Sequence, residues 1–151
     1  MSLKKLIALT AMLAAAVPGL GQAQQNPLTD NGKMMHGMLK LWVSGAAEKM
    51  PEADFMFKPT ADVRAFGQIV GHIADMQYHF CSALQGEADP KLRIEKTATS
   101  KAEVLTALKA AFTYCDKAFS GFTDQNATQA VKLDGRDFPR LGVMTVNSLH
   151  T

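Results

Sequence analysis

The segment from Ser100 to Gly121 constrains the fold most strongly, because its apolar residues recur at spacings of three and four. That spacing places them on one face of an α-helix. Ser100 followed by Glu103 matches a capping box, in which each side chain accepts a hydrogen bond from the other residue's backbone N–H. The apolar face consists of Val104, Leu105, Leu108, Phe112, Cys115 and Phe119. Other elements must cover this face, so the chain is predicted to fold by packing helices together.

Three more segments have helical spacing: Pro27–Lys49, Ala61–Gln85, and the segment from Pro139 to the end of the chain. Thr60 or Asp62 is expected to cap the second of these, and Gly86 to end it. The predicted apolar stripes are Leu39, Trp42, Val43 and Ala46 in the first, Phe66, Ile69, Val70, Ile73, Met76, Phe80 and Leu84 in the second, and Leu141, Met144, Val146 and Leu149 in the last. Val131–Phe138 is predicted to form a small hairpin around Asp134 and Gly135. The expected fold class is therefore all-α, a four-helix bundle.

The first residues are typical of a secretory signal. Lys4 and Lys5 precede an apolar run, and Gly21-Gln22-Ala23 offers small residues for cleavage. We expect a signal peptide at residues 1–23, a single domain at 24–151, and export to the periplasm or the medium. The apolar run is too short to cross a bilayer, so no membrane span is expected after cleavage. Without Lys4 and Lys5, 14 of the 16 basic residues remain against 14 acidic ones, which argues against a nucleic-acid partner.

The connection from Gly86 to Thr99 is long for an antiparallel turn and is long enough to return along a helix. The helices that it joins can therefore be parallel neighbours. Cys81 and Cys115 bear on this, because in antiparallel helices they would differ in height by about 15 Å, too far for a disulfide. Parallel helices and an oxidising compartment would allow a bridge, whereas the alternative is two buried small apolar side chains.

Two histidines are candidates for a metal site inside the bundle. His72 is expected about 21 Å from the end of its helix and His150 about 17 Å along the last helix, so antiparallel packing would bring them to similar depth. Neutral imidazole is a common ligand for zinc and nickel, and a catalytic site normally has three protein ligands. Asp75 and His36 are candidates for a supporting ligand, whereas His79 is expected about 10 Å from His72. The alternative is that these histidines are ordinary core or surface residues.

Three runs of residues resemble the DinB-like family of metalloenzymes: Met50-Pro51-Glu52-Ala53-Asp54, Phe57-Lys58-Pro59-Thr60, and Val63 through Ile73. In this resemblance His72 takes the place of the family's first metal ligand. The run Asn147-Ser148-Leu149-His150-Thr151 is similar to the start of a motif with two further histidines four positions apart.

The resemblance implies a four-helix bundle with an up-down-down-up order and a three-histidine site for a divalent metal, usually zinc or nickel. It also implies relatives that use small thiol cofactors. The second histidine of the last motif would fall three positions beyond Thr151, so the site and the last helix are expected to be incomplete. A metal is then not necessarily bound, and apolar surface beside the short helix would be exposed unless a ligand or another subunit, as in a homodimer, covers it.

Two functional hypotheses follow. In the first, His72 and His150 hold a divalent metal in a metalloenzyme that acts on a small-molecule substrate or a thiol cofactor, as a transferase or a hydrolase. In the second, the protein is a non-catalytic exported bundle or an inactive member of the family. The number of metal ligands distinguishes the two hypotheses.

Overall fold

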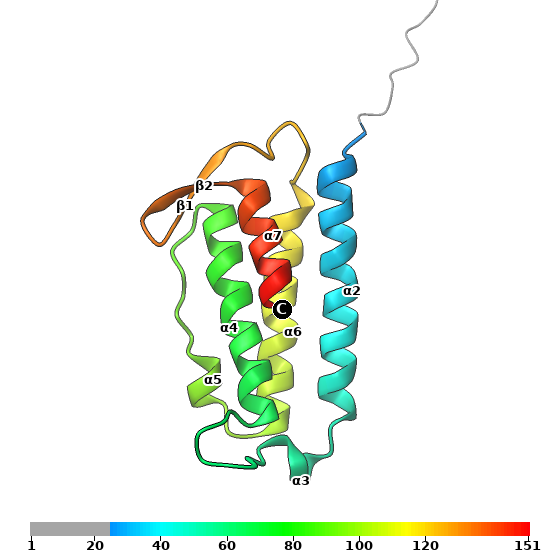
Figure 1. Ribbon diagram of the computed structural model, residues 1–151, viewed down its shortest axis with the longest axis vertical. Coiled ribbons are helices and arrows are strands. Elements are labelled where there is room, and N and C mark those ends of the chain that lie inside the picture. Colours follow the sequence, from blue (N-terminus) through cyan, green and yellow to red (C-terminus); the bar gives the residue numbers. More distant parts are fainter. Residues whose placement is uncertain (1–24) are drawn as a thin grey trace, which may run out of the picture.

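The structure is a computed structural model that describes residues 25–151, so the expected signal peptide lies outside the described residues. Four helices pack side by side in this part of the chain: α2 (Pro27–Lys49), α4 (Phe66–Gln85), α6 (Lys101–Ser120) and α7 (Arg140–His150). Figure 1 shows α4 and α6 running in one direction and α2 and α7 in the other. The predicted helical fold class is confirmed.

The two parallel helices, α4 and α6, are joined by a disulfide between Cys81 and Cys115, whose Cα atoms are 5.3 Å apart. Both cysteines are completely buried. They sit near the carboxyl ends of their helices, so the bridge fits parallel packing and would not fit the antiparallel arrangement. The connection between these helices returns along α4 and contains the short helix α5 (Ile94–Thr97) (Figure 1).

The sequence predicted α2 with both of its bounds, and it predicted the start of α6 correctly. The Ser100 hydroxyl accepts from the Glu103 amide, and the Glu103 carboxylate accepts from the amides of Ser100 and Thr99. The predicted start of α4 was wrong. This helix begins at Phe66 rather than Ala61, and the Gln68 side chain, rather than Thr60 or Asp62, caps it by accepting from the Ala65 amide at 3.0 Å.

A two-stranded hairpin connects α6 to α7, as predicted. Strand β1 (Ala130–Leu133) pairs antiparallel with β2 (Arg136–Pro139), and Val131 faces Phe138. Asp134 and Gly135 both have positive φ, at 49° and 78°, which is the backbone geometry of the tight type I′ turn. The hairpin crosses the end of the bundle before α7 begins at Arg140 (Figure 1).

The core lies between α4, α6 and α7, and α2 is less deeply buried. Four large residues of the predicted apolar stripes are exposed instead of buried, which makes these predictions wrong: Trp42 (59%), Ile69 (46%), Val146 (44%) and Leu149 (82%). In the predicted stripe of α2, Val43 packs against the core, whereas Trp42 and Ala46 are exposed. The buried residues of α2 are Thr29, His36 and Ala47. None of the described helices is long and apolar enough to cross a membrane.

Asp124, which follows α6, binds the start of α2. Its carboxylate accepts from the Thr29 amide at 2.9 Å and from the Leu28 amide at 3.2 Å. Desolvation alone would raise the pKa of Asp124, but the two amides, the Thr29 hydroxyl and Lys33 lower it below its usual value of 3.8. A negative charge at this position also interacts favourably with the amino end of the helix dipole. The ionised carboxylate therefore stabilises the attachment of α2.

The first prediction concerns the disulfide, which closes a sequence separation of 34 residues. Reduction is expected to lower the free energy of unfolding by about 2–4 kcal/mol, because the unfolded chain gains conformational freedom. Urea unfolding with and without a reductant measures the change. A Cys81→Ala/Cys115→Ala double variant serves as the control and should not respond to the reductant. Two reactive thiols in the denatured, unreduced protein would contradict the bridge.

The second prediction concerns pH. Since the folded-state pKa of Asp124 is lowered, its stabilisation is present above the unfolded value of 3.8 and is lost as the pH falls through the folded value. Asp124→Ala should therefore be less stable than the wild type at about pH 7, and the difference should shrink towards about pH 2. Urea unfolding at both pH values tests this. Asp62→Ala, which removes an exposed carboxylate, is the matched control. A difference independent of pH would contradict this role of the charge.

Candidate metal centre

The structure brings His72 and His150 together although they are far apart in the sequence. His72 lies in the middle of α4, and His150 is the last residue of α7. Their Nε2 atoms are 3.1 Å apart, and the centres of their rings are separated by 5.3 Å. The ring of Phe80, one of the core residues of α4, lies 5.8 Å from that of His150. The antiparallel packing of α4 and α7 thus places both imidazoles at the same depth.

Glu95 fixes the orientation of His72. Its Oε2 atom accepts from His72 Nδ1 at 2.9 Å, while Arg64 Nε donates to Oε1 at 2.7 Å. Burial alone would raise the pKa of Glu95, but the hydrogen bonds and charges of Arg64 and His72 lower it overall. The ionised carboxylate holds the proton of neutral His72 on Nδ1 and leaves the Nε2 lone pair directed at His150.

Asp75 and Gly71 hold the backbone of α5 close to α4. The two carboxylate oxygens of Asp75 accept from the Ile94 amide at 2.8 Å and the Glu95 amide at 3.0 Å. α5 approaches α4 at Gly71, which has no side chain. A Cβ atom at this position would lie 3.0 Å from the Glu95 backbone. Both residues therefore position Glu95 beside His72. Glu95 was not predicted from the sequence, because no periodic pattern marks it and its contact with His72 depends on the path of the connection.

The two facing Nε2 atoms are 3.1 Å apart, which fits either an N–H···N hydrogen bond from one imidazole to the other or a cation held between two lone pairs. Partial desolvation comes first in lowering the pKa of His150, followed by the charges of His72 and His79. Neutral His150 is thus favoured at neutral pH, and two neutral imidazoles can share either a proton or a metal ion at this distance.

The distance between the histidines fits a metal ion. Two nitrogens bound to one ion at about 2.0–2.1 Å each lie about 2.8–3.4 Å apart for bond angles between roughly 90° and 109°. The observed separation of 3.1 Å falls in this range. A carboxylate on the second nitrogen of a ligating histidine is also the usual arrangement around such ions. The residues present therefore fit two positions of a metal site.

The structure does not bring the other predicted residues into this pair. His36 is buried beside Phe112 and Phe119, and its Nε2 atom lies 3.1 Å from Asp116 Oδ1. Burial is the largest influence on the pKa of His36, and lowers it. Asp75 uses both oxygens on backbone amides. Within residues 25–151 no group of three or more histidine, cysteine or acidic side chains is arranged to hold a metal.

Comparison with known proteins places the chain in a family. Residues 43–151 match the model of the DinB superfamily, and this match covers more than half of the chain. The chain belongs to the DinB superfamily. The resemblance carried by the segment around His72 is thereby confirmed. No curated protein matches the chain in sequence.

Solved structures share the fold. The crystal structure of the mycothiol-dependent maleylpyruvate isomerase superposes with a TM-score of 0.64 at 12% identity. A histidine-to-alanine mutant of such an isomerase gives a TM-score of 0.66 at 11% identity. Each match covers 81% of this chain and 57% of the other, so the chain corresponds to little more than half of those structures. At these identities the likeness establishes the fold alone.

The third prediction tests the close approach at Gly71. A Gly71→Ala substitution should lower the free energy of unfolding by about 1–3 kcal/mol, because its methyl group must push against the Glu95 backbone. Gly45→Ala is the matched control, since a Cβ atom there meets nothing within 4 Å and alanine should stabilise the helix by up to about 1 kcal/mol. Denaturant unfolding compares the two. Equal effects would show that α5 does not need this contact.

Proposed function

We propose that the protein is an exported, metal-dependent enzyme of the DinB superfamily, in which His72 and His150 bind a divalent cation, zinc or nickel. The observation that carries the proposal is the pair of Nε2 atoms 3.1 Å apart, with Glu95 on the far nitrogen of His72. Histidine is the ligand shared by zinc and nickel, so the chemistry of the pair favours these metals over calcium or magnesium.

The surrounding residues have separate tasks in this proposal. Glu95 holds the proton of His72 on Nδ1, and Arg64 keeps Glu95 ionised through the 2.7 Å contact. Asp75 fixes the backbone of Glu95 through two amides. His72 and His150 would supply two protein ligands and leave positions open for a substrate. A bound divalent metal lowers the pKa of a thiol or water held beside it, which provides a nucleophile near neutral pH.

The name of the solved structures suggests the type of reaction. They are described as mycothiol-dependent, so a small thiol participates in the reaction of those proteins. We extend this to a metal-dependent transferase or isomerase that uses a small thiol, with hydrolysis as the reaction if water takes its place. The disulfide between Cys81 and Cys115 supports export, because oxidising compartments preserve such bonds.

The fourth prediction tests the histidine pair. Purified wild-type protein, dialysed against zinc or nickel, should retain the metal, whereas His72→Ala and His150→Ala should each lose it because one of two protein ligands is gone. Elemental analysis after dialysis measures metal per chain. His79→Ala is the control, since this histidine is on the same helix but binds Asp89 and Asp134 instead.

Glu95→Gln adds a second arm to the same experiment. This substitution removes the negatively charged group that accepts from His72 Nδ1, and it should weaken metal binding by about 10- to 100-fold. Equal metal content in the wild type and His72→Ala would refute the proposed site. The pair would then share a proton, and the second hypothesis, a non-catalytic binding protein, would be preferred.

A further inference from the structure

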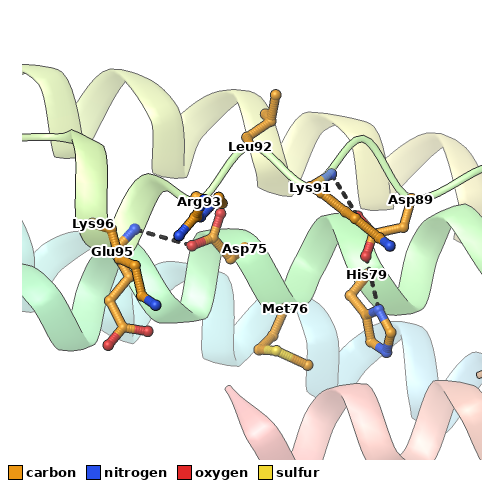
Figure 2. A pocket seen from close by; sticks show the side chains of 9 residues that line it. All are labelled: Asp75, Met76, His79, Asp89, Lys91, Leu92, Arg93, Glu95 and Lys96. Atoms are coloured by element: carbon orange, nitrogen blue, oxygen red, sulfur yellow. Dashed lines mark hydrogen bonds and ion pairs between the residues drawn. The ribbon is translucent and has the colours of Figure 1, made fainter.

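A cavity of about 370 Å³ lies beside the histidine pair, between α4 and the connection that returns along it. Glu95 both lines this cavity and binds His72, and His79 lines it while its charge acts on His150. Figure 2 shows Met76 and His79 reaching from α4, with Asp89 and Lys91 at one end of the view and Glu95 and Lys96 at the other. The cavity is therefore next to the proposed metal centre.

The acidic groups of the cavity are already engaged. Asp75 accepts from two backbone amides, and Asp89 accepts from His79 Nδ1 at 3.0 Å and from the Lys91 amide at 2.9 Å. Glu95 is held by Arg64 and His72. Each carboxylate thus already binds two donors of the protein, and the charges of Arg64 and Lys91 act on Glu95 and Asp89 respectively.

The basic groups of the cavity are in the opposite situation. Lys91, Arg93 and Lys96 line it, and among residues 25–151 none of their charged nitrogens has a carboxylate oxygen within 4.0 Å. Besides the hydrogen bond from its amide, Lys91 contributes to the lowered pKa of Asp89 through the charge of its ammonium group. These three side chains are exposed to solvent and carry positively charged donors, which suit the oxygens of an anion that displaces their water.

The backbone of the connection is shaped to present these side chains. Lys91 and Arg93 have positive φ values of 49° and 60°, a region that residues other than glycine seldom adopt. The carboxylate of Asp89 on the Lys91 amide and the carboxylate of Asp75 on the next turn hold this path. Leu92 and Met76 add apolar surface between the charges. The cavity therefore combines cationic donors with room for a small hydrocarbon body.

We propose that this cavity binds a small organic carboxylate, the substrate of the enzyme, with its carboxylate held by Lys91, Arg93 and Lys96 and its hydrocarbon part against Met76 and Leu92. The inference rests on the proposed function, since the substrate would lie next to His72 and His150. The chemistry of the cavity selects an organic acid over inorganic phosphate because the apolar side chains would have no partner in the latter.

The fifth prediction uses succinate, its neutral diamide succinamide, and inorganic phosphate as probes. Isothermal titration of metal-free, chelator-treated protein should show saturable binding of succinate and weaker binding of the other two. A Lys91→Gln/Arg93→Gln/Lys96→Gln variant should bind succinate about tenfold less tightly, because the charged hydrogen bonds are lost. The matched control is Lys49→Gln/Lys58→Gln/Lys109→Gln, which removes three exposed charges elsewhere and should change the affinity less than about twofold.

Circular dichroism of both variants verifies that they are folded. Absence of saturable succinate binding would overturn the proposal, and so would equal affinities of the two triple variants. Succinamide or phosphate binding as tightly as succinate would overturn it as well. Repeating the titration with His72→Ala separates the two proposals. Metal loss with succinate binding retained supports the anion site, and metal retention without succinate binding refutes the anion site alone.

Discussion

The parallel packing of α4 and α6 is the constraint on which the candidate site depends. Parallel neighbours require the chain to return along the full length of α4 before α6 begins, and that return carries Asp89, Lys91, Arg93 and Glu95. An antiparallel turn would have left α4 without these partners. The disulfide between the two helices fixes their relative height, and the site is then completed by α7 from the other side.

The sequence predicted the features that depend on local patterns. The bounds of α2, the capping box of α6 and the turn at Asp134 and Gly135 follow from spacing, caps and turn chemistry within a few residues. The start of α4 could not be predicted this way, because residues 61–65 have acceptable helix formers and cap residues. In the structure the Gln68 side chain accepts from the Ala65 amide, and the helix begins at the next residue, Phe66.

The site was predicted in part for a similar reason. The heights of His72 and His150 along their helices follow from the rise per residue, so the pair could be expected once the helices were placed. Glu95 lies in a connection, where no rule relates sequence position to position in space. Its partner Asp75 was considered as a metal ligand, but its role is to bind the amides of α5. A carboxylate near a histidine in sequence can thus serve the backbone and not the metal.

The exposed face of α2 has a consequence for how the protein is observed. Trp42 is the only tryptophan in the chain, and its side chain is 59% exposed on that face, away from the core between α4, α6 and α7. Its emission in the folded protein is therefore that of an indole largely in water, and unfolding changes its surroundings little. The tryptophan fluorescence of this protein should therefore respond to a molecule that binds over the exposed face of α2. Unfolding of the core has to be followed by other signals, such as circular dichroism.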